Sequence, residues 1–163
     1  MEHMNPRTAR VVALDKQFFM NRAKFHSKHP AMAELRVPYQ WDEGAVKVLN
    51  EILDATDAEI VLSSDWRLHW NLDELKGIFT WNGVKKSPIA VTSNIVEHMS
   101  TDLEDERQHQ IQLFKREHKP ESWVAIDDLD MSFSLGDHFF KTKSNMGIKQ
   151  TGLKDKIINR LNS

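Results

Sequence analysis

The sequence predicts an α/β fold in which helices cover both faces of a mainly parallel sheet. Short apolar runs alternate with longer segments of helical periodicity, and this order is typical of parallel strands joined by crossover helices. The chain has 163 residues, 40% of them hydrophobic, and holds only six glycines and five prolines. It is therefore long enough to bury one core and is not of a low-complexity class. We expect a single three-layer domain over residues 1–163, with at most a small cap or insertion at residues 16–44.

The predicted strands are short apolar runs that are too short for helices and long enough for strands. They are residues 8–14, 59–62, 88–92, 123–126 and 138–141. Residues 16–40 contain two prolines and many Lys and His residues. We expect a helix followed by an irregular connection there.

The predicted helices have apolar residues at helical spacing and polar residues at their starts. Asp42 is the expected N-cap of the first, with Ala45 at its N3 position and the helix ending near Thr56. Asn71 is the expected cap of the second. The remaining helices are predicted at residues 104–118 and 152–161.

The composition excludes several classes of function. Without cysteine the chain has no disulfide framework, zinc–thiolate site, iron–sulfur cluster or cysteine nucleophile. The net charge of −2 lacks the basic excess of proteins that bind nucleic acid without sequence preference. No Walker-type or dinucleotide-binding glycine motif is present. No apolar run approaches the ~20 residues of a membrane span, and the first ten residues are polar, so we expect a cytoplasmic protein.

Acidic, hydroxyl and guanidinium groups follow three of the predicted strands. Asp15 follows the first, the run Ser-Ser-Asp-Trp-Arg at 63–67 follows the second, and Asp127 and Asp128 end the fourth. The carboxyl ends of parallel strands meet at one edge of a sheet, where ligands bind. Clustered carboxylates favour a hard cation such as Mg²⁺, and Ser and Arg donors suit phosphate oxygens. These residues therefore favour metal-assisted phosphoryl transfer.

Two of these runs also carry a family resemblance. Ile-Val-Leu-Ser-Ser-Asp-Trp-Arg at 60–67, followed by Trp-Val-Ala-Ile-Asp-Asp at 123–128, resembles the haloacid dehalogenase (HAD) superfamily. More narrowly, it resembles the HAD domains of Swiss Army knife RNA-repair proteins, from about Trp41 to the C-terminus. The resemblance implies a Rossmann-like HAD fold and a Mg²⁺-dependent phosphohydrolase that acts on a phosphomonoester through an aspartyl-phosphate. It also implies a phosphorylated small molecule, a nucleotide or a nucleic-acid end as the substrate.

The resemblance assigns roles to hydroxyl and guanidinium groups. Ser63 matches the hydroxyl that binds the transferring phosphate, and Ser64 is the alternative for that role. Arg107 matches the basic residue that neutralises the phosphate and orients the nucleophile. Arg67 resembles a substrate-binding arginine typical of the subfamily. Without the resemblance, Arg107 among acidic residues at a helix start is equally well explained as part of a solvated helix end.

The resemblance also assigns the acidic residues. Asp127 and Asp128 match the pair that holds Mg²⁺, and Asp15 matches the nucleophile that shares the metal. The family's first motif reads Asp-x-Asp-Gly after an apolar strand. Here Gln17 stands at the position of the general acid and Phe18 at that of the glycine. A glutamine side chain cannot donate a proton to a leaving alkoxide.

Two explanations of this departure stay open at the level of sequence. In the first, Asp15 belongs to a degenerate first motif, which gives a weak enzyme or an inactive one. In the second, the first motif lies upstream of Met1, and Val11–Leu14 is only a hairpin or insertion strand. The alternative function is a catalytically degenerate HAD fold that binds a phosphorylated ligand or a protein partner.

Overall fold

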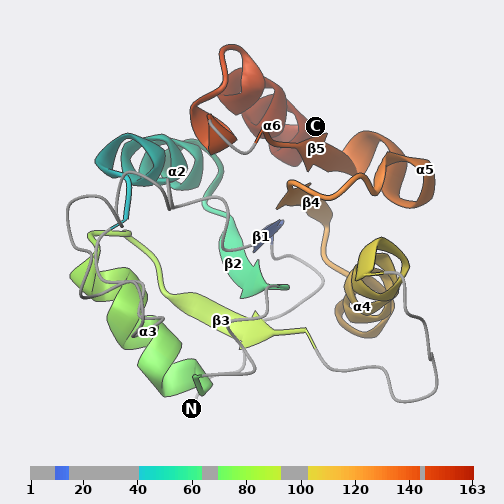
Figure 1. Cartoon of the computed structure of the whole chain (residues 1–163), viewed down its shortest axis with the longest axis horizontal. Coiled ribbons are helices and arrows are strands. Elements are labelled where there is room, and N and C mark those ends of the chain that lie inside the picture. The colour runs from blue at the N-terminus through green and yellow to red at the C-terminus, as the bar shows by residue number, and fades with distance from the viewer. Residues whose placement is uncertain (1–9, 15–40, 64–69, 93–102, 144–145) are drawn as a thin grey trace.

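The computed structural model describes residues 10–14, 41–63, 70–92, 103–143 and 146–163, and these contain a five-stranded sheet (Figure 1). The strands are β1 (Arg10–Leu14), β2 (Glu59–Leu62), β3 (Pro88–Val91), β4 (Ser122–Asp127) and β5 (Phe139–Lys141). Their order across the sheet is β3-β2-β1-β4-β5. Every neighbouring pair is parallel, which confirms the predicted α/β class with a parallel sheet.

Strand β1 occupies the centre of the sheet. Its Val12 is aligned with Ile60 of β2 on one side and with Val124 of β4 on the other. The expectation that Val11–Leu14 is only a hairpin or insertion strand is therefore wrong, because a hairpin strand would pair antiparallel with its neighbour in sequence. The strand that precedes Asp15 holds the central position between the strands that precede Ser63 and end at Asp127.

The helices begin largely where the sequence predicts. They are α2 (Glu43–Thr56), α3 (Leu72–Trp81), α4 (Leu103–His118), α5 (Ser132–Leu135) and α6 (Leu153–Asn162), with 3-10 turns η4 (Gly136–His138) and η5 (Gly147–Lys149). Asp42 Oδ1 accepts a hydrogen bond from the Ala45 N–H at 3.0 Å, as expected for the N-cap of α2. Asn71 caps α3 in a reciprocal capping box with Glu74. Helix α5 and the two turns are not predicted, because such short segments carry no periodicity.

Helices cover both faces of the sheet and make three layers. On one face, β-strand residues pack against α2, α3 and α6; on the other they pack against α4 and α5. Alternation along the strands divides the apolar residues between the two cores. The first core includes Val12, Ile60, Leu62, Val124 and Ile126 from the strands, and the second includes Val11, Ala13, Val61, Trp123 and Ala125.

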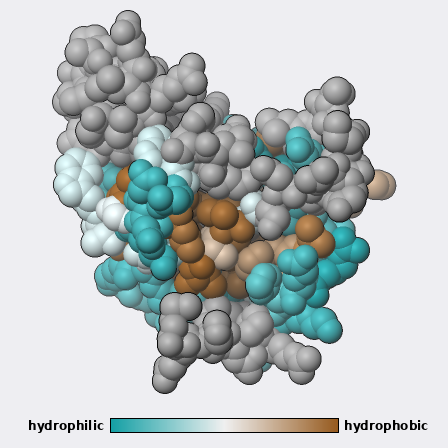
Figure 2. Space-filling view, turned by 90° about the horizontal axis from the view of Figure 1, so that it is seen from below, coloured by the Kyte–Doolittle hydropathy of each residue, from teal (hydrophilic) through white to brown (hydrophobic). Residues whose placement is uncertain are grey.

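The outer strand β3 is less well covered than the centre. Ile89, Ala90 and Val91 are half-buried, whereas Ile60 of the neighbouring β2 is fully buried. In the view from below, apolar residues lie in the middle of the visible surface, with hydrophilic residues on either side of them (Figure 2). In the described part of the chain, no helix has both the length and the apolar character needed to cross a bilayer.

The expected cap or insertion at residues 16–44 falls mostly on positions 16–40, which lie outside the described residues. Its last positions lead into α2, which begins at Glu43. The cap and the single domain over residues 1–163 remain predictions.

Candidate active site at the carboxyl edge of the sheet

The register of the sheet places the residues that follow the strands in one row. Leu14 of β1 is aligned with Leu62 of β2 and with Ile126 of β4. The next positions along these strands are Ser63 and Asp127, so only β1 separates them. Neighbouring strands lie ~4.8 Å apart, which puts about 10 Å between the backbones at Ser63 and Asp127.

Successive side chains of a strand point to opposite faces of the sheet, and this alternation decides the face on which Ser63 and Asp127 lie. Leu62 and Ile126 belong to the core under α2 and α6, so the residues that follow them turn to the opposite face, under α4. Ser63 and Asp127 are 1% and 2% exposed. Buried polar groups at this edge are therefore directed toward the start of α4, the helix that carries Arg107.

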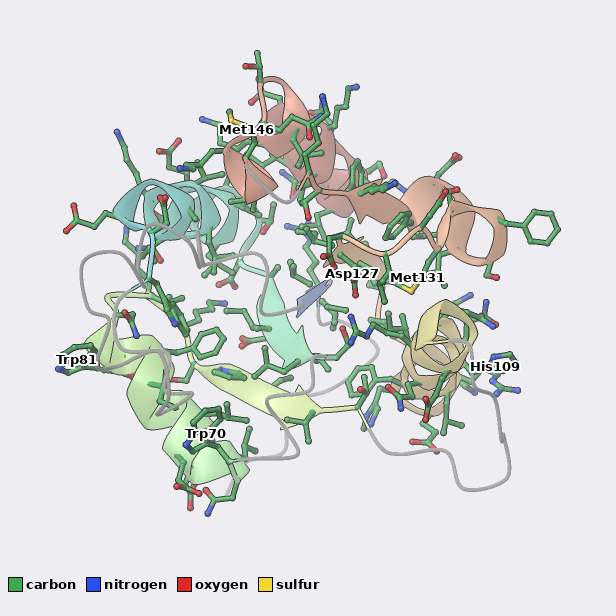
Figure 3. All side chains as sticks on the ribbon, viewed as in Figure 1. Trp70, Trp81, His109, Asp127, Met131 and Met146 are labelled. Atoms are coloured by element: carbon green, nitrogen blue, oxygen red, sulfur yellow. The ribbon has the colours of Figure 1, made fainter. Side chains whose placement is uncertain are left out.

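Arg107 and Asp127 form a buried ion pair. Arg107 Nη1 lies 3.0 Å from Asp127 Oδ2 and 3.3 Å from Oδ1, and both side chains are at most 5% exposed. Figure 3 shows Asp127 at the centre of the molecule, at the end of β4 and on the side of β1. Arg107 lies in the first half of α4, so this contact joins the helix to the central part of the sheet. The two residues that the sequence assigned to one site are in contact.

The loop after β4 fixes the orientation of the Asp127 carboxylate. The backbone N–H of Leu129 donates to Asp127 Oδ1 at 3.0 Å. Farther along, Asp130 accepts hydrogen bonds from the hydroxyl and the backbone N–H of Ser132. The hydrogen bond from the Ser132 hydroxyl is the largest cause that holds the pKa of the Asp130 carboxyl below its ordinary value. The acidic loop is therefore held by its own hydrogen bonds, with Asp128 half-buried next to Asp127.

The donor chemistry of this edge fits a hard cation. Arg107 and Leu129 donate hydrogen bonds to the Asp127 carboxylate, and Asp128 follows it in the chain. Carboxylate oxygens are the ligands that Mg²⁺ prefers. Within the described ranges no group of three or more His, Cys, Asp or Glu residues is placed to hold a metal. Asp15, the third expected ligand, falls outside those ranges.

The structure describes four of the seven predicted site residues. Ser63, Arg107, Asp127 and Asp128 lie at one edge of the sheet. Asp15, Ser64 and Arg67 lie outside the described residues, and their assignments remain predictions.

One polar residue at this edge is not predicted as part of a site. Thr92 directly follows β3, and its N–H donates to the carbonyl of Leu62 at 2.9 Å, so it lies beside Ser63. The rule that identified Asp15, Ser63 and Asp127 also applies to the third strand. Thr92 is predicted as the last residue of that strand, and a lone threonine with no acidic or basic neighbour gives no reason to single it out.

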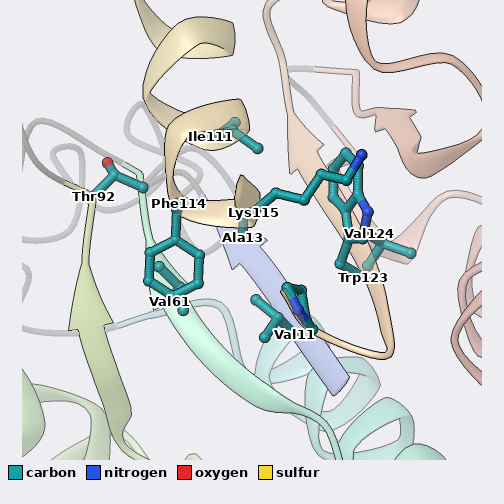
Figure 4. Close-up of a pocket in the computed structure, with 10 residues that line it drawn as sticks. Val11, Ala13, Val61, Thr92, Ile111, Phe114, Lys115, Trp123 and Val124 are labelled. Carbon is teal, nitrogen blue, oxygen red and sulfur yellow. The ribbon is translucent and has the colours of Figure 1, made fainter. Parts of the chain in front are cut away.

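A small cavity lies beneath this edge, between the sheet and α4 (Figure 4). Its volume of about 10 Å³ has room for the centre of roughly one water molecule. Most of its lining is apolar, including Val11, Ala13 and Phe114. The cavity is a packing gap of the second core and is too small for a substrate.

Comparison with known proteins identifies the family. The model of the HAD domain in Swiss Army Knife RNA repair proteins matches residues 11–153, which is most of the chain. The match begins in the central strand β1 and includes Ser63, Arg107 and Asp127. No curated protein and no solved structure matches the chain significantly. The chain belongs to the family of HAD domains of Swiss Army Knife RNA repair proteins.

Proposed function

We propose that the protein is a Mg²⁺-dependent phosphohydrolase that acts on a phosphomonoester, with a nucleotide or a nucleic-acid end as the favoured substrate. The observation that carries the proposal is the buried Arg107–Asp127 ion pair at the carboxyl edge of a parallel sheet. A charge pair is costly to bury, so its presence at the edge where such folds bind ligands favours a functional role. The substrate class rests on the family, whose domains occur in RNA repair proteins.

The proposed reaction uses the row of residues that follow the strands. A carboxylate oxygen of Asp15 attacks phosphorus, a bond from that oxygen to phosphorus forms, and the bond to the leaving oxygen breaks. Water then attacks the phosphorus of the aspartyl-phosphate, which releases phosphate and restores the carboxylate. Asp15 directly follows the central strand β1 in the sequence, and β1 lies between β2, which precedes Ser63, and β4, which ends at Asp127.

The buried residues bind and orient the reacting groups. The Ser63 hydroxyl donates a hydrogen bond to a phosphoryl oxygen. Arg107 orients the Asp127 carboxylate through its hydrogen bonds and supplies positive charge near the phosphoryl group. Asp15, Asp127 and Asp128 would hold Mg²⁺, which when bound neutralises charge on the phosphoryl oxygens.

Hydrolysis of 4-nitrophenyl phosphate tests the proposal. We expect turnover with Mg²⁺ and none after treatment with EDTA. Asp15→Asn and Asp127→Asn should each lower kcat/KM by at least about 100-fold, because each removes a charge that acts on the reacting group. Asp73→Asn, an exposed carboxylate at the start of α3, is the matched control and should leave kcat/KM unchanged.

The outcomes separate the enzyme from its alternative. Absence of metal-dependent turnover at high enzyme concentration, together with measurable phosphate binding, favours the degenerate HAD fold that binds a phosphorylated ligand. Gln17 is the feature that favours this alternative. If turnover is found, its rates with nucleoside monophosphates, 5′-phosphorylated oligonucleotides and sugar phosphates define the substrate class.

A further inference from the structure

Thr92 combines burial with an unused hydroxyl. Its side chain is 2% exposed, and within the described structure its Oγ1 has no hydrogen-bond partner. A buried hydroxyl normally finds a partner, since leaving one unpaired costs stability. Val occupies nearly the same volume and would avoid this cost. The hydroxyl at position 92 therefore calls for a reason outside the packing of the protein.

The cavity next to Thr92 does not supply that reason. Figure 4 shows the methyl group of Thr92 turned toward the apolar side chains that line the cavity and its hydroxyl turned away from them. An apolar gap that has room for roughly one water offers few polar partners to hold that water in place. The hydroxyl instead lies at the carboxyl edge of the sheet.

The position of Thr92 in the sheet brings its hydroxyl near the proposed phosphate site. Val91 is aligned with Leu62, so Thr92 and Ser63 are the next residues on neighbouring strands. Adjacent strands lie ~4.8 Å apart, which is short enough for two hydroxyls to reach oxygens of one phosphoryl group. Thr92 lines the cavity on the α4 face, which is also the face of Arg107 and Asp127.

We infer that Thr92 is a substrate-binding residue whose hydroxyl, beside that of Ser63, donates a hydrogen bond to an oxygen of the phosphorylated substrate. This inference rests on the proposed function. Thr92 and Ser63 follow neighbouring strands and are both buried, so a phosphoryl group bound by the Ser63 hydroxyl lies within reach of the Thr92 hydroxyl. The Thr92 hydroxyl has no hydrogen-bond partner in the described part of the protein and gains one, a substrate oxygen, in the complex.

The variant Thr92→Val tests this role because it removes the hydroxyl and keeps the shape. In the absence of ligand we expect Tm to rise by roughly 2–6 °C, since an unpaired buried group is lost. With Mg²⁺ present, KM for 4-nitrophenyl phosphate and the dissociation constant of inorganic phosphate should each rise about 10-fold, with kcat changed much less. Thr92→Ser keeps the hydroxyl and should keep both constants within about threefold of wild type.

Thr56→Val is the matched control. Thr56 is also buried, but its Oγ1 donates to the Ile52 carbonyl at 2.8 Å and accepts from the Ala58 N–H at 3.2 Å, at the other edge of the sheet. Removal of this paired hydroxyl should lower Tm and leave KM and phosphate binding unchanged. The substitutions Thr92→Val and Thr56→Val are thus expected to change Tm in opposite directions.

Each remaining outcome counts against the inference. It is overturned if Thr92→Val raises Tm and leaves KM and phosphate binding as in wild type, or if it lowers Tm as Thr56→Val does. If wild type binds phosphate without turnover, phosphate binding alone decides between the variants. If wild type neither hydrolyses 4-nitrophenyl phosphate nor binds phosphate, the proposed function fails and the role of Thr92 fails with it.

Discussion

The Arg107–Asp127 ion pair should contribute both to the stability of the protein and to the proposed chemistry. Both are buried, so each charge is stabilised by the other. The contact also connects α4 to the end of β4, which are separate layers of the fold. Substitution of either residue should therefore affect both folding and the site.

Arg107→Met is expected to lower the free energy of unfolding by about 3–5 kcal/mol, because it leaves the Asp127 carboxylate buried without its cation. Urea denaturation of the wild type and the variant measures this. Lys85→Met is the control: Lys85 pairs with Asp54 at the surface, where both side chains are more than half exposed. Its loss should cost at most about 1 kcal/mol. Equal losses of unfolding free energy in Arg107→Met and Lys85→Met would contradict a larger contribution from the buried ion pair.

Gln17, at the position of the general acid, gives a second expectation for single residues. Without an acid, the proposed phosphohydrolase should hydrolyse esters of good leaving groups much faster than alkyl phosphates. Gln17→Asp should raise kcat for an alkyl phosphate by about 100-fold or more and change 4-nitrophenyl phosphate hydrolysis far less. Gln17→Asn, which also lacks an acid, is the control and should show no rise. Equal rates for both ester types in wild type would exclude this explanation.

A histidine in its neutral form links α6 to strand β4. The Trp123 carbonyl lies 2.9 Å from His138 Nδ1, and Arg160 Nη2 of α6 lies 2.9 Å from His138 Nε2. A carbonyl only accepts and a guanidinium only donates, so Nδ1 carries the proton and Nε2 accepts. The ring also stacks on Trp123, with centroids 4.1 Å apart. A second proton would break the bond with Arg160.

This arrangement predicts that stability falls in acid. Desolvation is the largest cause that lowers the pKa of His138 from its ordinary value of 6.5, followed among the lowering causes by the charges of Arg160 and Lys115; the Trp123 carbonyl and Asp137 act in the opposite direction. The unfolded chain therefore binds this proton more readily, and the contribution of His138 is complete above about pH 6.5 and lost as the pH falls below it.

Chemical denaturation of wild type and His138→Gln at pH 7.5 and pH 5.5 measures the effect. Wild type should lose more stability than the variant between these two values, because the variant cannot take up the proton at position 138. Comparison of the two proteins cancels the contribution of the other histidines. An identical loss in both would show that His138 does not contribute to the pH dependence.

At the scale of the whole molecule, the central position of β1 should make truncation of its side chains more costly to stability than truncation on the outer strand. Val12 is fully buried between strands on both sides, whereas Val91 lies half-buried on the outer strand β3. Val12→Ala should lower the free energy of unfolding by about 2 kcal/mol and Val91→Ala by about half of that or less. Urea denaturation compares the two. The reverse order would contradict the strand order described above.

Much of the fold follows from the sequence because local patterns determine local elements. Glu59–Leu62 is predicted with its observed bounds, and the caps Asp42 and Asn71 act as expected, since each depends on residues close in sequence. The neighbours of β1 could not be derived in this way, because an apolar run does not record which strands it pairs with. Strand order, rather than strand existence, distinguished the two explanations of Val11–Leu14.

Part of the candidate site could likewise be predicted from the sequence, and part of it depends on the fold. Clusters of chemically distinctive residues, such as Asp127 with Asp128, are visible in the sequence and point to a site. The contact of Arg107 with Asp127 depends on how α4 lies on the sheet, so the sequence supports it only through the family resemblance. Thr92 became conspicuous only when burial and hydrogen bonding were known, because an unpaired hydroxyl is a property of the fold.

The pairing of β1 with β4 also has a consequence for the order in which the protein is made. Arg10 is aligned with Ser122, more than 100 residues later in the chain, so the central strand has one free side until β4 has left the ribosome. Until then it can pair only with β2, and the long closure that follows is the slow kind of contact in folding. The nascent chain thus exposes a half-paired apolar strand until β4 has been synthesised, and the contact of Arg107 with Asp127 can form only after that point.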